Sequence, residues 1–340
     1  MRRSMVPVAF AGLALLAALP AAADPIADFY HGKTLTMIVG TSAGNDYDYR
    51  ARLVARFMGH HIPGEPSIVP RNMPGAGGVV AANDLATIEP HDGTVLHMIM
   101  SNMMANQAMA LPGIKFDTRK FFWIGNTTST PNVMVAWHTT GVTTIEQAKQ
   151  KQLTMGAPTG TAGVTYVEAM NALVGTKFKL VTGYPGGNEV NLAMERGEVD
   201  GRASNSWASW KSTKPDWITE KKMNVLVQIG VKRDPDLKDV PLLLELARND
   251  ADRAVLTFLS NKTAIARSVV AAPGTPPERV AALRHAFDET MKDPGFLAEA
   301  AKTKMDISPV PGAEAQKIAD AIVNTPADVV ARARKLLGDS

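Results

Sequence analysis

Cysteine is absent from all 340 residues of the sequence. Disulfides, thiol chemistry, cysteine-ligated metals and a lipid anchor on an N-terminal cysteine are therefore excluded. Beyond residue 24, no apolar run is long enough to cross a membrane. The seven histidines form no H-x-x-x-H or H-E-x-x-H pair, and no two carboxylates stand out as a catalytic pair. The sequence therefore predicts no metal site and no cofactor, and these absences favour a binding protein over an enzyme.

The longest apolar stretch lies at the N-terminus and has the pattern of a secretory signal. Arg2 and Arg3 precede an apolar run over residues 6–19, and three alanines at 21–23 form a small-residue cleavage site. Cleavage there would leave 317 residues, enough for two cores of about 100–150 residues each. It would also lower the net charge from +3 to +1, which argues against nucleic acid as a partner. We expect secretion to the periplasm.

Residues 34–59 predict a buried strand, a glycine-rich turn and an amphipathic helix. Tyr49, Leu53 and Phe57 recur at helical spacing, so that Arg50 and the other arginines can face elsewhere, and Asp48 is expected to cap the helix. Small residues between a strand and a helix leave backbone N–H groups unpaired at the helix start, where the helix dipole adds positive potential. We therefore expect this turn to bind a carboxylate or a phosphate.

The same turn matches G-x-S-x-G, the nucleophile motif of α/β-hydrolases, with Ser42 at the serine position. A hydrolase of that fold needs several strands before this motif, including one whose loop completes the oxyanion hole. Fewer than twenty residues separate Ser42 from the predicted cleavage site, which leaves no room for those strands. A serine hydrolase using Ser42 stays open as an alternative.

Beyond this unit, short apolar strands alternate with helices, which is typical of α/β architecture with mostly parallel sheets. A strand over 153–157 ends in a second loop of small residues, 156–163, that leads into a helix. This loop has no Gly-Lys-Ser/Thr and is not a phosphate-binding P-loop, but it is a second helix-start anion site. A further helix is expected after Tyr184, with Asn188 as its cap. Two such loops in a chain of two domains predict the opposite walls of one cleft.

Six motifs in order resemble those of a known family, the substrate-binding proteins of tripartite tricarboxylate transporters, or Bug and TctC-type periplasmic receptors. The resemblance covers residues 28–337. The family's PAGGGxD and A-R-L fall at 42–48 and 51–53, its N-R-P-G-A-G-G at 72–78 and its P-D-G-Y-T-L at 91–96; its Y-K-G-G, G-x-V-D and A-P-A-G-T-P fall at 184–187, 197–200 and 271–276. Together the motifs are specific, although no single one is decisive.

The resemblance implies a two-lobed type II periplasmic-binding (Venus-flytrap) α/β fold in which each lobe is a mostly parallel sheet flanked by helices. The lobes are expected at 24–124 with 255–340, and at 125–254. It also implies a monomeric receptor that binds a small mono- or dicarboxylate and passes it to one small and one large membrane permease subunit. The predicted ligand-binding residues are Ser42, Ala43, Gly44, Asn45, Asp46, Tyr47, Gly77, Gly78, Ser101, Gly160, Thr161, Ala162, Thr165, Gly186, Gly187, Arg202 and Asn205.

The sequence departs from the family pattern at Asn45 and Asp46, which replace two loop glycines, and at Ala162, which replaces a serine. Asn and Asp tolerate left-handed backbone conformations, so the turn can survive. A carboxylate at Asp46 repels an anionic ligand unless it points away or meets a cation, whereas Arg202 offers a direct partner for a carboxylate. Two more alternatives therefore stay open, a sensory receptor that feeds a signalling partner and a receptor that has lost carboxylate binding.

Overall fold

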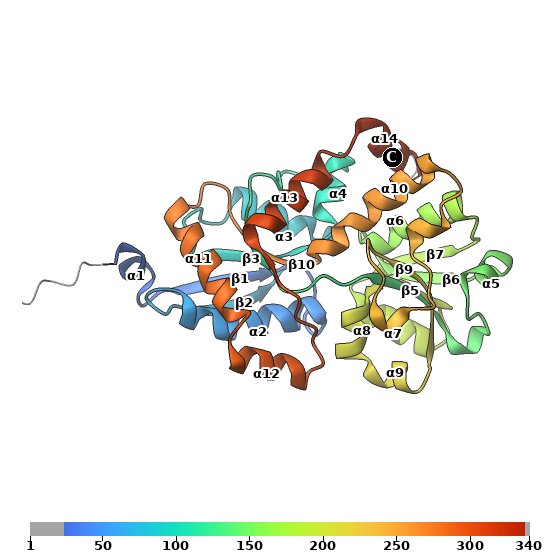
Figure 1. Ribbon diagram of the computed structural model, residues 1–340, viewed down its shortest axis with the longest axis horizontal. Coiled ribbons are helices and arrows are strands. Elements are labelled where there is room, and N and C mark those ends of the chain that lie inside the picture. The colour runs from blue at the N-terminus through green and yellow to red at the C-terminus, as the bar shows by residue number, and fades with distance from the viewer. Residues whose placement is uncertain (1–23, 337–340) are drawn as a thin grey trace, which may run out of the picture.

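The computed structural model describes residues 24–336, in which two sheets stand side by side along the long axis (Figure 1). The predicted signal segment at 1–23 lies outside the described residues. The first sheet has the order β11-β4-β10-β3-β1-β2, and the second has the order β7-β6-β8-β5-β9. Helices flank both sheets, so the predicted two-lobed α/β fold is confirmed. Among residues 24–336, no helix is both long and apolar enough to span a membrane.

The first lobe is built around the six-stranded sheet. Its strands are β1 (Thr34–Val39), β2 (Ser67–Asn72), β3 (Val95–Met100), β4 (Phe122–Asn126), β10 (Arg267–Ala271) and β11 (Val310–Pro311). Its helices are α1 (Pro25–Tyr30), α2 (Asp46–His61), α3 (Val79–Thr87), α4 (Met103–Ala108), α11 (Pro277–Thr290), α12 (Pro294–Lys302) and α13 (Gly312–Val323). An apolar core that includes Leu35, Met58 and Phe287 packs α2, α11 and α12 against one face of this sheet.

The second lobe is built around the five-stranded sheet. Its strands are β5 (Asn132–Trp137), β6 (Thr154–Pro158), β7 (Lys179–Tyr184), β8 (Gly201–Ser206) and β9 (Met223–Ile229). Its helices are α5 (Ile145–Gln150), α6 (Ala162–Ala169), α7 (Gly187–Glu195), α8 (Trp207–Thr213) and α9 (Pro215–Thr219). Trp137, Trp210 and Trp217 form a buried aromatic cluster on one face of the sheet.

Most strands of each sheet point in the same direction, as predicted, and β10, β11 and β5 are reversed. β1 pairs in parallel with β2 and β3, and β6 with β7 and β8. β10 runs antiparallel to β3 and β4, and β5 runs antiparallel to β8 and β9. β5 and β10 are the strands by which the chain enters the second sheet and returns to the first. They are buried along their whole length, so both belong to the interior of their sheets.

The predicted lobe boundaries at residues 125 and 255 fall inside β4 and α10 (Asp250–Asn261). Because a strand belongs to one sheet, we propose that the chain crosses between the lobes at 127–131 and at 262–266. The chain ends in two helices, α13 and α14 (Ala327–Leu336), within the described residues. Figure 1 shows α14 beside α10 and α6, against which it packs, so the chain end reaches the second lobe as well.

Helix α2, which starts the first lobe, differs from its sequence prediction in the residues that it buries. Leu53 and Met58 are buried as expected, but Tyr49 is 47% exposed. Arg50, expected on the polar side, is buried with 1% of its surface exposed. The spacing rule counts arginine as polar, whereas this arginine points into the protein to reach a carboxylate one helical turn earlier. This buried charge belongs to the site described next.

Candidate functional site

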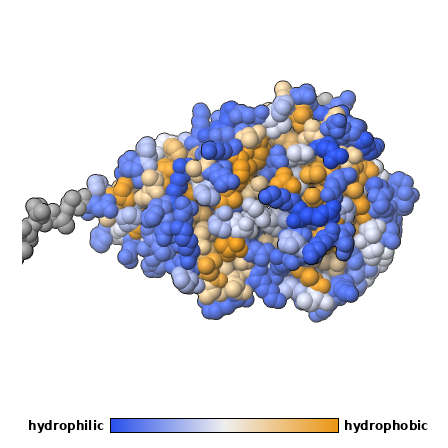
Figure 2. All heavy atoms as spheres, in the orientation of Figure 1, coloured by the Kyte–Doolittle hydropathy of each residue, from blue (hydrophilic) through white to orange (hydrophobic). Residues whose placement is uncertain are grey.

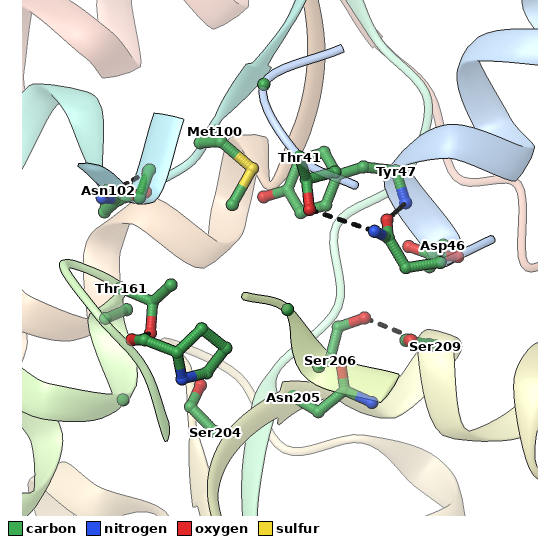
Figure 3. Close-up of a pocket in the computed structure, with 18 of the residues that line it drawn as sticks. Thr41, Asp46, Tyr47, Met100, Asn102, Thr161, Ser204, Asn205, Ser206 and Ser209 are labelled. Atoms are coloured by element: carbon green, nitrogen blue, oxygen red, sulfur yellow. Dashed lines mark hydrogen bonds between the residues drawn. The ribbon is translucent and has the colours of Figure 1, made fainter. Parts of the chain in front are cut away.

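A cavity of about 380 Å³ lies between the two lobes, and both lobes contribute to its wall. The first lobe supplies the loop after β1, the residues before α3 and the end of β3. The second supplies the loops after β6 and β7 and the end of β8. Figure 3 shows Tyr47 and Met100 on one side of this space, with Thr161, Ser204 and Asn205 on the other. On the face seen in Figure 2, polar residues predominate and apolar residues form narrow bands between them.

Most of the predicted ligand-binding residues line this cavity. Those in its wall are Asn45, Asp46, Tyr47, Gly77, Ser101, Thr161, Ala162, Gly186, Gly187, Arg202 and Asn205. Those outside it are Ser42, Ala43, Gly44, Gly78, Gly160 and Thr165. The carbonyl of Gly160 faces Gly77, and Thr165 is buried in α6. The two predicted loops therefore do form opposite walls of one cleft, although parts of each loop lie behind it.

The cavity also has lining residues that the sequence analysis missed, and Arg267 is the most important. It opens β10, within an apolar stretch, and belongs to no motif. A charged residue at the start of a buried strand needs a buried partner, and that requirement was the only signal in the sequence. The other missed residues are Gly40, Thr41, Pro74, Gly75, Ala76, Met100, Asn102, Asn132, Pro158, Thr159, Gly163, Tyr184, Pro185, Asn188, Ser204, Ser206, Ser209 and Thr213.

The first loop uses its backbone N–H groups within itself. The side chain of Asn45, not that of Asp48, caps α2 and accepts hydrogen bonds from the N–H groups of Tyr47 and Asp48, at 3.0 and 3.3 Å. The N–H of Gly44 donates to the Asp48 carboxylate over 2.9 Å. The expected anion site at this helix start is therefore occupied by the protein's own side chains, because Asn45 replaces a residue without a side chain.

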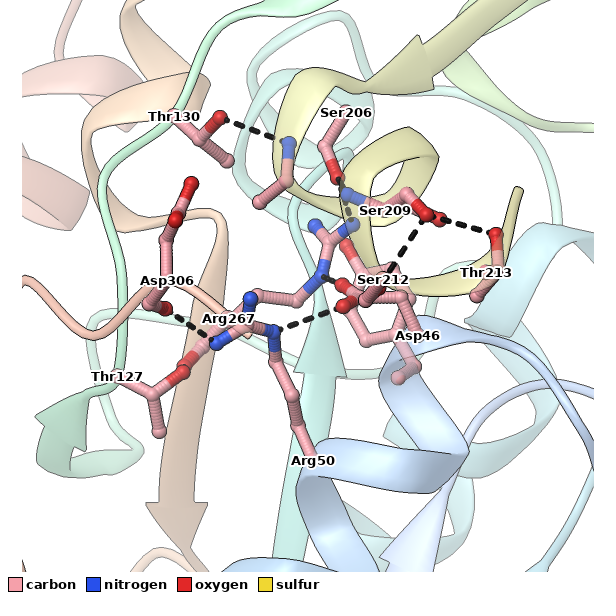
Figure 4. A network of polar contacts seen from close by, with 12 residues as sticks. Asp46, Arg50, Thr127, Thr130, Ser206, Ser209, Ser212, Thr213, Arg267 and Asp306 are labelled. Carbon is pink, nitrogen blue, oxygen red and sulfur yellow. Dashed lines mark hydrogen bonds and ion pairs between the residues drawn. The ribbon is translucent and has the colours of Figure 1, made fainter. Parts of the chain in front are cut away.

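Asp46 joins two buried arginines at the wall of the cavity (Figure 4). Its two carboxylate oxygens accept from Nε of Arg50 at 2.9 Å and from Nε of Arg267 at 2.6 Å. Burial alone would raise the pKa of Asp46, but the charges and hydrogen bonds of both arginines outweigh it and hold that pKa below its usual value. Asp46 is therefore ionised at neutral pH.

Arg267 is held by neutral partners as well. Its Nη2 donates to the Ser206 hydroxyl over 2.8 Å, and its guanidinium lies 3.9 Å from the centre of the Tyr47 ring. Ser206 belongs to the second lobe, so this hydrogen bond crosses the cleft. The guanidinium charge of Arg267 is thus committed to Asp46, and its orientation is fixed by the side chains around it.

Arg202 is different, because it forms no ion pair with any of the described residues. Its Nη1 donates to the Asn191 side chain over 2.9 Å, whereas its Nε is buried without a partner. Its guanidinium lies against Gly187, where any Cβ would overlap it. Burial, with a smaller contribution from the charge of Arg267, lowers the pKa of Arg202 to about 9, against the weaker opposing effect of Glu189. Arg202 is therefore a charged, unpaired cation at neutral pH.

The position of Arg202 places this cation beside the first turn of α7. The helix begins at Gly187 with Gly186 at its cap, two positions before the predicted cap at Asn188, and no side chain caps it. The start of a helix carries positive potential from its unpaired N–H groups. A cation there is unfavourable unless an anion joins it. The exposed Glu189 in the first turn is the nearest compensation that the described residues provide.

The two lobes touch on both sides of the cavity. On one side, Nδ2 of Asn102 donates to the carbonyl oxygens of Gly77 and Gly160, each over 3.3 Å. A Cβ at Gly77 would overlap the Gly160 carbonyl. On the other side, Nδ2 of Asn188 donates to the Gly44 carbonyl over 3.0 Å. These contacts close the cleft over the cavity.

The site contains no pair of groups of the kind that a hydrolase or a metal needs. Ser42 lies outside the cavity, near Gly186, where a Cβ would come within 2.6 Å of its hydroxyl oxygen. Within residues 24–336, no hydrogen bond joins Ser42 to a histidine, although its carbonyl accepts from Asn45. The same residues hold no group of three or more acidic or histidine side chains arranged for a metal ion.

Two α/β lobes that close over a cavity have the fold of the two-lobed periplasmic solute-binding proteins. More specifically, the chain belongs to the tripartite tricarboxylate transporter receptor family, whose model matches residues 51–336. Members of this family are periplasmic binding proteins. The resemblance seen in the sequence is thereby confirmed.

Individual relatives agree with this assignment. The chain is 27% identical over 314 residues to a UPF0065 protein in the gbd 5′ region of Cupriavidus necator, covering 89% of this chain and 88% of that protein. An R. palustris protein solved with adipate is 20% identical, with a TM-score of 0.69 over 89% of this chain and 98% of that one. MatC from Rhodopseudomonas palustris, solved with malate, is 19% identical, with a TM-score of 0.66 over 90% and 99%. These structures establish the fold.

Proposed function

We propose that this protein is a periplasmic receptor that captures a small organic acid between its lobes and delivers it to a tripartite tricarboxylate-type permease. One observation carries the proposal. Arg202 is an unpaired guanidinium in the wall of the cavity, set beside the uncapped start of α7. An organic acid would supply the missing anion.

Electrostatics support an anionic ligand at this position. Burying a cation without a counter-ion is costly, and the helix start adds to that cost. A carboxylate beside Arg202 would offset both the cost of burying the cation and the repulsion from the helix start. It would also accept charge-assisted hydrogen bonds, each contributing about 1.5–3 kcal/mol. The guanidinium is held in place by Asn191 and has room only because residue 187 is glycine. The site is thus arranged before any ligand arrives.

The closed cleft supports capture rather than surface binding. Asn102 and Asn188 bridge the lobes on opposite sides of the cavity. A ligand enclosed between them would contact both lobes and stabilise the closed form over an open one. We propose that the predicted residues that line the cavity contact this ligand.

The proposal also covers the secretion of the protein and its partners in the membrane. The N-terminal segment would direct secretion and be removed, and the mature receptor would act as a monomer without a cofactor. The closed form would present its ligand to one small and one large membrane subunit. We infer no catalytic role, because Ser42 lies outside the cavity.

A binding assay on ligand-stripped protein tests the proposal. The mature protein is unfolded and refolded to remove co-purified ligand and then screened by thermal shift against aliphatic, aromatic and amino acids. A ligand that binds only the native state stabilises it by about 2.7 kcal/mol at a hundredfold excess over Kd. We expect one class of acid to raise the melting temperature, and Arg202→Gln to abolish that shift.

Arg196→Gln is the matched control, since Arg196 lies at the C-terminal end of α7, away from its first turn, and its side chain is exposed. It should retain the full shift. No stabilisation by any acid, from protein that is folded, would refute the proposed function.

A further inference from the structure

The two lobes contribute different charged groups to the cavity wall, Arg202 from the second lobe and Asp46, paired with Arg50 and Arg267, from the first, and this difference bears on the kind of acid that fits. We propose that the ligand carries a single anionic group, held at Arg202, and that its other end, beside Asp46, is neutral. This inference rests on the proposed function and specifies the ligand class of that same site. It separates this receptor from proteins of the same fold solved with the diacids adipate and malate.

A second carboxylate has no binding site at the first-lobe end of the cavity. Asp46 lines that end, and its negative charge faces any approaching anion. Arg267 already pairs with Asp46, and Arg50, which pairs with it too, does not line the cavity. At the helix start next to them, the N–H groups of Gly44, Tyr47 and Asp48 already donate to the side chains of Asn45 and Asp48. A carboxylate placed here would be buried without a partner, which is strongly unfavourable.

A cationic group is excluded from the same end by the same cluster. Both oxygens of Asp46 already accept from guanidinium groups. An ammonium brought to Asp46 would come close to Arg267, whose guanidinium also lines the cavity. The cluster of Asp46, Arg50 and Arg267 carries two positive charges and one negative charge. Its net positive charge therefore repels a cation, whereas an anion is kept from direct contact with the Asp46 carboxylate itself.

A neutral group meets suitable neighbours there. The ring of Tyr47 and the side chain of Met100 line this end of the cavity, and Figure 3 shows the Met100 thioether close to the open space. An apolar or hydroxylated end can pack against them without losing charge solvation. The cavity thus combines one anionic anchor in the second lobe with a neutral contact surface in the first.

The experiment compares acids that differ only at the far end. Ligand-stripped protein is titrated calorimetrically with adipate, with the ω-amino acid and the ω-hydroxy acid of the same length, and with the unsubstituted monoacid. Benzoate and terephthalate form a second, rigid pair. We expect the neutral-ended acid of a series to bind at least about tenfold more tightly than its diacid or amino-acid counterpart, or 1.4 kcal/mol.

An Asp46→Asn variant adds a direct test of the mechanism. It removes the negative charge and frees the charge of Arg267 for a ligand. We expect it to shift the preference about tenfold or more toward the diacid. Should this variant fail to fold, the comparison on the unaltered protein decides the question alone.

The outcomes separate this inference from the function on which it rests. Tighter binding of a diacid by the unaltered protein would overturn the single-anion inference and leave the receptor intact. Tighter binding of the amino acid would also overturn it, because Asp46 would then act as a partner for ammonium. No binding by any acid would overturn the proposed function, and this inference with it.

Discussion

Replacing Gly77 by alanine should weaken ligand binding while leaving the fold in place. Gly77 has φ +62, and its added Cβ would overlap the Gly160 carbonyl of the other lobe. The backbone strain of a left-handed alanine costs roughly 1–2 kcal/mol in the folded protein, whether the cleft is open or closed. The overlap exists only when the cleft is closed. Overpacking of this kind costs about 1–3 kcal/mol, so the affinity should fall about 5- to 150-fold.

Gly32→Ala provides the matched control. Gly32 has φ +69, close to that of Gly77, but a Cβ there meets nothing within 4 Å. Both variants should lose a similar free energy of unfolding in denaturant titrations, and only Gly77→Ala should lose affinity in calorimetry. Unchanged affinity in Gly77→Ala would show that the lobes do not meet at this point when ligand is bound. Equal losses in both variants would assign the effect to stability rather than to closure.

Three further changes have distinct expected results. Asn188→Ala removes the 3.0 Å hydrogen bond to the Gly44 carbonyl. The affinity for the ligand should therefore fall about two- to tenfold in calorimetry, with little change in melting temperature. An unchanged affinity would contradict a role of Asn188 in closing the cleft. Binding should hold through neutral pH and weaken above about 9 as Arg202 loses its proton, and full affinity well above that pH would contradict anchoring by its charge. Burial lowers the pKa of Lys262 from 10.5 to about 7. Between about pH 7 and pH 10.5, Lys262 is therefore protonated in the unfolded state but largely neutral in the folded state. Because the unfolded state binds more protons there, this residue makes the free energy of unfolding rise with pH across that range. In denaturant titrations, the free energy of unfolding of Lys262→Met should rise less with pH over this range and should be higher than that of the unaltered protein at neutral pH. The same pH dependence of the free energy of unfolding in both proteins would contradict a buried Lys262 that changes its charge on unfolding.

The elements of the fold were largely predictable because they depend on local patterns. The buried strand and the amphipathic helix predicted within 34–59 appear as β1 and α2, and the strand predicted at 153–157 appears at Thr154–Pro158. An apolar run and apolar residues at helical spacing are signals that need no distant partner. The direction of β5 and β10 was not predictable in this way, because it depends on where the chain crosses between the lobes.

The site was harder to predict, because its charges are paired across long stretches of sequence. Arg50 and Asp46 are one helical turn apart, a spacing visible in the sequence, but burial of both depends on Arg267, 221 residues beyond Asp46. The start of α7 was placed two residues too late for a related reason. Gly187 is required by the guanidinium of Arg202 from another element, and helix-capping preferences do not include such a contact.

The resemblance to a family supplied the positions of the two loops but could not supply their chemistry. The family pattern places an anion site at the first helix start. Here the substitution by Asn45 fills that site with a side chain, and Asp46 recruits two arginines. The departures from the family pattern, rather than the matches, therefore led to the inference on ligand class.

A crystal structure of the protein with the tightest-binding acid of the panel tests the central claim most directly. The account predicts the carboxylate within hydrogen-bonding distance of the Arg202 guanidinium, about 2.7–2.9 Å, beside the first turn of α7 in a closed cleft. A carboxylate bound instead at the loop of Asn45 and Asp46, with Arg202 left unpaired, would contradict it.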